Sequence, residues 1–402
     1  MAFTIEKKWE GELLRAGILD TPHGVIKTPA FVSVGTQATV KSLTTDMLKE
    51  VGAQVVLANT YHLYLEPGDE LVRDAGGLGK FMNWDGPTMT DSGGFQAFSL
   101  GAAFGKGGVS KVARGEVRGL TEVRLPEGSP TSNPSEAPLA TVTEDGVSFK
   151  SHRDGSEHFF TPERSIEIQH NIGADIIFAF DECTSPHASD EYQKEALGRT
   201  HRWARWSLEK HQALGGPQQL LGVVQGGRVR ELREESARVI GGMPFDGFGI
   251  GGSFNKDDIG TAVGWVNALL PEDKPRHLLG IGEPEDIING VENGCDLFDC
   301  VTPTRHGRTG TLHTREGRMN IGNSQYRKDL APMEEGCDCY TCAHYSRAYL
   351  AHLFRAGEML AGTLASIHNM RFVVRLTEEL RQAIFNGTFV EYKREFLTKY
   401  RR

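Results

Sequence analysis

Residues 220–227 read Leu-Leu-Gly-Val-Val-Gln-Gly-Gly, an apolar run that ends in an amide and two glycines. Nearly continuous apolar runs of this length are typical of parallel strands that are buried on both faces. Seven more short apolar runs occur along the chain, at residues 30–34, 54–59, 88–91, 175–180, 247–251, 277–281 and 296–299. The pattern predicts eight buried strands.

Helical patterns separate several of these runs. Thr161-Pro-Glu-Arg reads as an N-cap followed by a proline in the first helical turn. Further helices are expected at 190–213, 228–240 and 284–293. Strands that alternate with helices predict an α/β fold, a (β/α)8 TIM barrel, with a doubly wound parallel sheet as the alternative. In a barrel, the carboxyl ends of the strands form the active site.

Three regions are expected along the chain. Residues 1–330 would form the barrel, 331–370 a metal-binding subdomain, and 371–402 a C-terminal helical segment that packs on the barrel. Residues 101–150 contain eight glycines and four prolines, which predicts a long loop after the third strand. This loop is either a surface insertion or a lid or partner contact over the barrel mouth.

Composition excludes some classes of protein. The 402 residues include 44 Lys and Arg against 53 Asp and Glu, a net charge of −9, which excludes a small basic nucleic-acid-binding module. A local basic patch remains, formed by Arg305, Arg308, Arg315, Arg318, Arg327 and Lys328. The N-terminus lacks an apolar signal core and no run approaches the roughly 18 apolar residues of a membrane span. We therefore expect a cytoplasmic protein without a membrane partner.

A cysteine cluster predicts a metal site. Cys337-Asp-Cys339-Tyr-Thr-Cys342 brings three thiolates close enough to bind one tetrahedral zinc ion. A fourth ligand is needed, and the candidates are His344, His352 and His368. Such a site would be closed and structural, with no open position for catalysis.

Polar residues follow several of the predicted strands. Asp91, Asp181 and Asp299 lie at the ends of predicted buried strands. A buried carboxylate there costs free energy unless it is paired with a cation, bound to a ligand or needed for catalysis. Two carboxylates that flank an anomeric carbon suit glycosidic chemistry through a covalent intermediate. Gln225 and the Gly-Ile-Gly-Gly run at 249–252 could approach a planar base closely and read its edge.

Five motifs in chain order together resemble the tRNA-guanine transglycosylase family. They are Asp-Ser-Gly-Gly-Phe-Gln at 91–96, Phe-Asp-Glu-Cys-Thr at 180–184, Val-Gln-Gly-Gly at 224–227, Gly-Ile-Gly-Gly at 249–252 and Phe-Asp-Cys-Val-Thr-Pro-Thr-Arg at 298–305. The resemblance covers about residues 10–395. It implies a TIM barrel with a C-terminal zinc-binding subdomain. It also implies exchange of guanine at the wobble position of tRNAs with G-U-N anticodons for a 7-deazaguanine, in queuosine biosynthesis.

The resemblance also implies a role for individual residues. Asp299 would be the nucleophile on the ribose, and Asp91 the general acid and base. Asp181 would accept hydrogen bonds from the base, while Gln225 and the Gly252 N–H would bind its carbonyl side. Phe95 would stack on the base. The remaining residues of the base pocket would be Ser92, Gly93, Gly94 and Cys183.

Two segments would contact the anticodon loop by the same resemblance. The first comprises Gly280, Ile281, Gly282, Glu283, Pro284, Glu285 and Asp286, and the second Thr304, Arg305, His306, Gly307 and Arg308. Among the three candidate histidines, the resemblance favours His368 as the fourth ligand of one structural Zn²⁺ per chain. It further implies a homodimer with the zinc region near the interface.

The sequence departs from the family pattern in three places. Residues 253–257 read Ser-Phe-Asn-Lys-Asp beside the pocket for the 7-substituent, Glu283 stands where a basic residue is expected, and 101–150 is longer than usual. Cys183 is the bacterial-type residue, and Asp257 could favour an aminomethyl ammonium group. We therefore favour 7-aminomethyl-7-deazaguanine as the incoming base. Queuine, or a paralogue that inserts a deazapurine into another nucleic acid, is the alternative.

Overall fold

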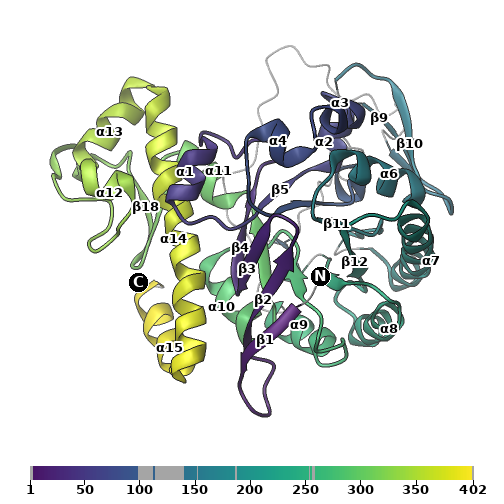
Figure 1. Cartoon of the computed structure of the whole chain (residues 1–402). Helices are drawn as coiled ribbons and strands as arrows, with labels where there is room; N and C mark the ends of the chain where they lie inside the picture. Colours follow the sequence, from purple (N-terminus) through teal and green to yellow (C-terminus); the bar gives the residue numbers. More distant parts are fainter. Residues whose placement is uncertain are drawn as a thin grey trace.

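A closed barrel of eight parallel strands forms the centre of the computed structural model (Figure 1). Each strand overlaps one of the eight apolar runs, so the predicted (β/α)8 barrel is confirmed and the doubly wound alternative is wrong. In their order around the barrel, the strands are β11 (Ile176–Phe178), β12 (Gln219–Val224), β13 (Gly247–Ile250), β15 (Arg276–Leu278), β16 (Leu297–Cys300), β4 (Ala30–Val34), β5 (Val56–Ala58) and β6 (Thr88–Thr90). The structure describes residues 3–97, 112–113, 140–151, 153–185, 188–252, 254–255 and 259–400.

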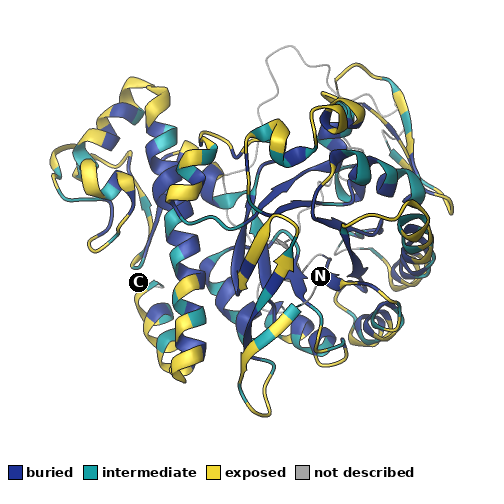
Figure 2. Ribbon diagram, in the orientation of Figure 1, coloured by how far each residue is buried: buried dark blue, intermediate teal, exposed yellow. Residues whose placement is uncertain are grey.

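Helices follow most of the barrel strands. Thr161 caps the first helix after the inserted segment by accepting a hydrogen bond from the Arg164 N–H, and Ser189 caps the next one in the same way through Tyr192. The helices between strands are α1 (Thr45–Glu50), α2 (Thr60–Leu65), α3 (Asp69–Asp74), α4 (Leu78–Met82), α6 (Pro162–Ile172), α7 (Asp190–Leu214), α8 (Arg230–Gly241), α9 (Ile259–Asn267) and α10 (Pro284–Glu292). Their buried sides face the barrel and their outer sides are exposed (Figure 2).

Alternate side chains of the barrel strands enter two different cores. On β12, Leu221 and Val223 belong to the apolar cluster inside the barrel, whereas Leu220 and Val224 belong to the cluster under the helices. The same alternation explains why these strands are apolar on both faces. Because side chains fill the barrel, its interior offers no pore, and a site can open only at the strand ends.

An antiparallel sheet that the sequence analysis did not predict covers the amino ends of the barrel strands. Its strands are β1 (Phe3–Lys8), β2 (Arg15–Thr21) and β3 (Gly24–Thr28). Arg15 binds Asp296, which directly precedes β16, and His23 binds Asp175, which directly precedes β11. The Gln219 side chain donates to the Asp20 carbonyl. The sheet therefore closes the end of the barrel opposite to the predicted active site.

The C-terminal part of the chain forms a separate group of elements beside the barrel (Figure 1). They are α11 (Thr302–Arg308), the hairpin of β17 (Thr311–Thr314) and β18 (Gly317–Asn320), η2 (Ser324–Lys328), α12 (Tyr340–His344), α13 (Arg347–Ala356), α14 (Met359–Asn386) and α15 (Phe389–Tyr400). The long helix α14 packs on α11, α10 and β4. The division of the chain at residues 330 and 370 stays a prediction.

Only parts of the segment at 101–150 are described. β8 (Ala140–Val142) and β9 (Val147–Lys150) form an antiparallel sheet with β10 (Glu157–Phe160). β7 (Val112–Ala113) pairs in parallel with β14 (Phe254–Asn255). The interpretation of this segment as a lid or a surface insertion concerns mainly residues outside the described ones. Across the described residues, the structure contains no helix with the length and apolar character that a bilayer crossing needs.

The ion pair between Arg15 and Asp296 gives a testable prediction about the fold. Asp296 accepts from Arg15 Nε at 3.1 Å, from Arg15 Nη2 at 2.5 Å and from the Arg276 N–H at 2.8 Å, and both side chains of the pair are buried. Asp296→Ala should lower the free energy of unfolding by about 3–5 kcal/mol, because it leaves a buried guanidinium without its counter-charge. Urea denaturation measures this, and Asp74→Ala, at an exposed position on α3, is the control. Equal midpoints for the two variants would refute the assigned role.

Candidate active site

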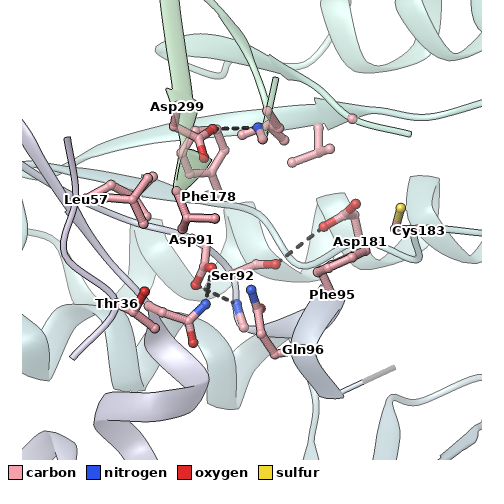
Figure 3. A pocket seen from close by; sticks show the side chains of 18 of the residues that line it. Thr36, Leu57, Asp91, Ser92, Phe95, Gln96, Phe178, Asp181, Cys183 and Asp299 are labelled. Carbon is pink, nitrogen blue, oxygen red and sulfur yellow. Dashed lines mark hydrogen bonds between the residues drawn. The ribbon is translucent and has the colours of Figure 1, made fainter. Parts of the chain in front are cut away.

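A cavity of about 280 Å³ opens at the carboxyl ends of the barrel strands. Each of the eight strands, or the loop that follows it, contributes to its lining. The lining residues with functional groups are Thr36, Asn59, His62, Asp91, Ser92, Gln96, Asp181, Cys183, Gln225, Asp299, Cys300 and Arg305. The sequence analysis expected the active site at this face, and Figure 3 shows Asp91, Asp181 and Asp299 in the same pocket.

Asp91 follows β6 directly and is held by donors from two loops. Its Oδ1 accepts from the Thr60 N–H at 2.9 Å and from the Gly93 N–H at 3.2 Å, and its Oδ2 accepts from the Asn59 side-chain amide. Gly93 has a φ of +78°, and a Cβ there would lie 3.2 Å from the Tyr61 nitrogen. A side chain at this position would therefore disturb the turn that presents the Gly93 N–H to Asp91.

Asp299 lies on β16, and its side chain is 14% exposed. Its Oδ1 is 2.7 Å from the Gly280 N–H and 2.9 Å from His277 Nε2. Both partners come from β15 or the turn that follows it, the strand adjacent to β16 in the barrel. The neighbouring Cys300 differs from Asp299 in charge. Burial raises the pKa of its thiol and favours the protonated, uncharged form.

Asp181 and Gln225 form a polar pair in the pocket. Gln225 Nε2 donates to Asp181 Oδ2 at 2.6 Å, and the Ser92 hydroxyl donates to Asp181 Oδ1 at 3.3 Å. Phe95 and Cys183 lie beside Asp181 in the pocket (Figure 3). Gly94 packs closely here, since a Cβ at this position would lie 3.0 Å from the Asp181 carbonyl oxygen. All the predicted base-pocket residues except Gly94 therefore line one cavity, and Gly94 packs beside it against Asp181.

Arg233 lies fully buried behind this pocket, and the sequence analysis missed it. Its guanidinium donates to the carbonyls of Gly227 at 2.8 Å and Gly251 at 2.6 Å, which ties the two glycine-rich loops together. Burial lowers the pKa of Arg233 to about 10, so the group stays charged at neutral pH. At Gly252, with a φ of +120°, a Cβ would lie 2.2 Å from Arg233 Nη2. Glycine is therefore required where the Gly252 backbone faces the pocket.

The two segments expected to contact RNA differ in exposure. In the first, Ile281, Gly282, Pro284 and Asp286 are buried, whereas Gly280, Glu283 and Glu285 are partly accessible. Glu283 is the acidic residue that departs from the family pattern. It forms an ion pair with Arg318, so its negative charge is paired with a cation.

The second segment coincides with helix α11. Arg305 and Arg308 are exposed, whereas Thr304 and Gly307 are buried. Gly307 packs against α14, where a Cβ would lie 2.8 Å from the Ser366 nitrogen. His306 Nδ1 is 2.9 Å from His313 Nε2 on β17, which ties the helix to the C-terminal hairpin. The two arginines are therefore the cations that this helix presents to solvent.

Cys337, Cys339, Cys342 and His368 form one cluster, with ligand atoms all within 4.8 Å of one another. His368 Nδ1 is 3.7, 3.7 and 3.3 Å from the three sulfur atoms in that order. His368 Nε2 lies 2.8 Å from the His313 carbonyl and donates to it, which leaves Nδ1 to face the thiolates. His344 and His352 are exposed and stand outside this cluster. The predicted set of four ligands can therefore bind a metal ion.

Among the residues that hold the site in place, the sequence analysis missed Asn59, Thr60, His277 and Arg233. Asn59 ends a predicted strand, and so the rule that pointed to Asp91 could have found it. His277 was expected only as a strand residue, and its contact with Asp299 depends on the pairing of β15 with β16. Arg233 lies within a helix pattern that reads as solvent-exposed and charged.

Comparison with known proteins supports one family. The family described as queuine tRNA-ribosyltransferase matches residues 11–121 and 128–402. A queuine tRNA-ribosyltransferase of Caldanaerobacter subterraneus subsp. tengcongensis is 46% identical over 401 residues, which cover 99% of this chain and 97% of the relative. One from Pelotomaculum thermopropionicum is 45% identical, with 100% and 99% covered, and one from Roseiflexus sp. is 46% identical, with 99% of each covered. The chain therefore belongs to the queuine tRNA-ribosyltransferase family.

Proposed function

We propose that this enzyme exchanges guanine at the wobble position of tRNAs with G-U-N anticodons for a 7-deazaguanine, with 7-aminomethyl-7-deazaguanine as the favoured incoming base. The observation that carries the proposal is the composition of the pocket. Two carboxylates, Asp91 and Asp299, stand in one cavity with Asp181 and Gln225, a pair that can bind the edge of a purine. Family membership supports tRNA as the substrate.

Asp299 is the proposed nucleophile. One of its carboxylate oxygens attacks C1′ of the ribose, the bond between C1′ and the base breaks, and an ester between Asp299 and the ribose forms. The incoming base then attacks C1′ and releases the carboxylate. Two displacements at one carbon retain the configuration. The contacts of Asp299 with Gly280 and His277 support this role, because they favour the charged carboxylate and fix its orientation.

Asp91 is the proposed general acid and base. It would protonate the departing guanine and take a proton from the incoming base. Donors from Asn59, Thr60 and Gly93 surround its carboxylate, which limits the orientations that it can adopt. Such fixed geometry is what proton transfer to a bound base requires.

The base would bind across the pair of Asp181 and Gln225. Asp181 would accept hydrogen bonds from N1–H and the exocyclic amine, while Gln225 and the Gly252 N–H would bind the carbonyl oxygen. Phe95 would stack on the ring. Ser92, Gly93 and Cys183 would complete the pocket, with Gly94 packed against Asp181. The buried guanidinium of Arg233 supports this arrangement, because it ties together the loops that carry Gln225 and Gly252.

The anticodon loop would bind over the barrel mouth. Arg305 lines the pocket and Arg308 follows one turn later on the same helix, so both can contact phosphates. Among the residues of 280–286, the partly accessible Gly280, Glu283 and Glu285 would face the RNA.

Zn²⁺ is the proposed occupant of the Cys3His cluster. Three thiolates and an imidazole form the ligand set that zinc prefers, and the distances between sulfur and nitrogen suit a tetrahedral ion. The ion would supply no reaction chemistry, because the four protein ligands complete its coordination. A homodimer, with the zinc region near the interface, is part of the same proposal.

Replacing the proposed nucleophile tests the mechanism. Asp299→Asn should reduce base exchange by roughly a thousandfold or more and abolish any tRNA adduct that survives denaturation, because an amide cannot displace the base. Denaturing electrophoresis with labelled tRNA measures the adduct. Asp74→Asn, at an exposed position on α3, is the matched control and should behave like the wild type. An adduct in Asp299→Asn would contradict the assignment.

Competition between bases tests substrate choice. Labelled guanine, 7-aminomethyl-7-deazaguanine and queuine are offered in parallel, with an unmodified tRNA that has a G-U-N anticodon. We expect a higher kcat/KM for 7-aminomethyl-7-deazaguanine than for queuine. A higher value for queuine would instead assign the enzyme to base salvage. If none of the three bases is incorporated into this tRNA, a different nucleic acid would be the favoured substrate.

Loss of one metal ligand tests the zinc assignment. His368→Gln should reduce the zinc content measured by elemental analysis and lower the melting temperature by roughly 5 °C or more, since the cluster joins α12 to α14. His344→Gln is the matched control, because His344 is exposed and should leave both quantities unchanged. Equal zinc content in the two variants would exclude His368 as a ligand.

A further inference from the structure

His277 is a buried histidine in direct contact with the proposed nucleophile. It lies on β15 with a side chain that is 0% exposed, and its Nε2 is 2.9 Å from Asp299 Oδ1. One side of its ring packs edge-on against Phe178, with ring centroids 5.5 Å apart. The base-pocket residues do not include it, so its contact with the site passes through Asp299.

The surroundings of the ring define which of its nitrogen atoms donates to Asp299. Asp299 Oδ1 already accepts a hydrogen bond from the Gly280 N–H, so this oxygen acts as an acceptor and Nε2 is assigned the proton. Nδ1 is buried and has no hydrogen-bond partner among the residues that the structure describes. The ring is therefore a hydrogen-bond donor to the carboxylate through Nε2.

This donor acts differently on the two states of Asp299. A hydrogen bond to a charged carboxylate is stronger than one to the carbonyl oxygen of an ester. Donors at Oδ1 therefore favour the free carboxylate over the ribosyl ester. They also stabilise the carboxylate as it leaves in the second displacement.

We propose that His277 is a positioning residue that sets how readily the covalent intermediate is reversed. With the Gly280 N–H, it orients Asp299 for attack and keeps the ester from becoming a stable end state. The inference deepens the proposed function and rests on Asp299 as the nucleophile. No proton moves to or from His277 in either displacement.

The equilibrium between adduct and free guanine tests this role. Attack by Asp299 on tRNA releases guanine, so added guanine reverses the adduct. In His277→Phe, which keeps the ring and removes the N–H, the guanine concentration that halves the adduct should rise roughly tenfold. The melting temperature should stay equal or rise, because the buried Nδ1 acceptor is also removed. Labelled tRNA on denaturing gels gives the midpoint, and the KM for guanine, measured separately, should be unchanged.

Two further variants separate donation from packing. Gln and Met have similar length, but only Gln can donate to Asp299. His277→Gln should restore a midpoint near that of the wild type, whereas His277→Met should resemble His277→Phe. If His277→Phe does not fold, the comparison of His277→Gln with His277→Met alone decides whether the hydrogen bond to Asp299 sets the midpoint.

The inference is overturned if folded variants without the donor show a midpoint equal to or below that of the wild type. A purely structural role would instead reduce the melting temperature and the amount of adduct together, with no rise in the midpoint. An adduct that persists in Asp299→Asn would overturn the proposed function itself, and so the two failures are distinguishable.

Discussion

Closure of eight parallel strands into one barrel is the constraint on which the rest of the structure depends. It places the carboxyl ends of all the strands around a single opening, so residues more than 200 positions apart, such as Asp91 and Asp299, enter one cavity. The packed interior prevents the cavity from extending down the barrel. The sheet of β1, β2 and β3 covers the other end. The fold therefore has one open face for chemistry and one face for stability.

The carboxylates at the two ends of the barrel differ in their surroundings. Asp296, at the amino end, faces the guanidinium of Arg15, and removal of either partner would leave a buried charge. Asp91 and Asp299, at the carboxyl end, accept hydrogen bonds from backbone N–H groups, a side-chain amide and an imidazole. Hydrogen bonds of this kind hold a carboxylate in one orientation, which suits the roles of nucleophile and of general acid and base that we propose for these two residues.

Sequence alone predicted the features that depend on local pattern. Apolar runs identified all eight barrel strands, and cysteine spacing identified three of the four residues in the metal cluster. Distal His368 was one of three open candidates until the family resemblance was considered. The sheet of β1 to β3 was missed because its strands have mixed polarity, as Phe3–Lys8 shows. The contact between His277 and Asp299 was missed because it depends on which strands are neighbours, and no local pattern contains that information.

The Cys3His cluster is connected to α11, the helix that we propose contacts RNA, through one short stretch of α14. His368 donates to the His313 carbonyl, and the next residue, Asn369, accepts from the His313 N–H and donates to the Pro303 carbonyl at the start of α11. His313 in turn contacts His306 on α11. A metal ion that fixes His368 therefore also fixes the backbone on which Arg305 and Arg308 stand. By this route, a closed metal site with no open coordination position would support the RNA binding that we propose for the barrel mouth.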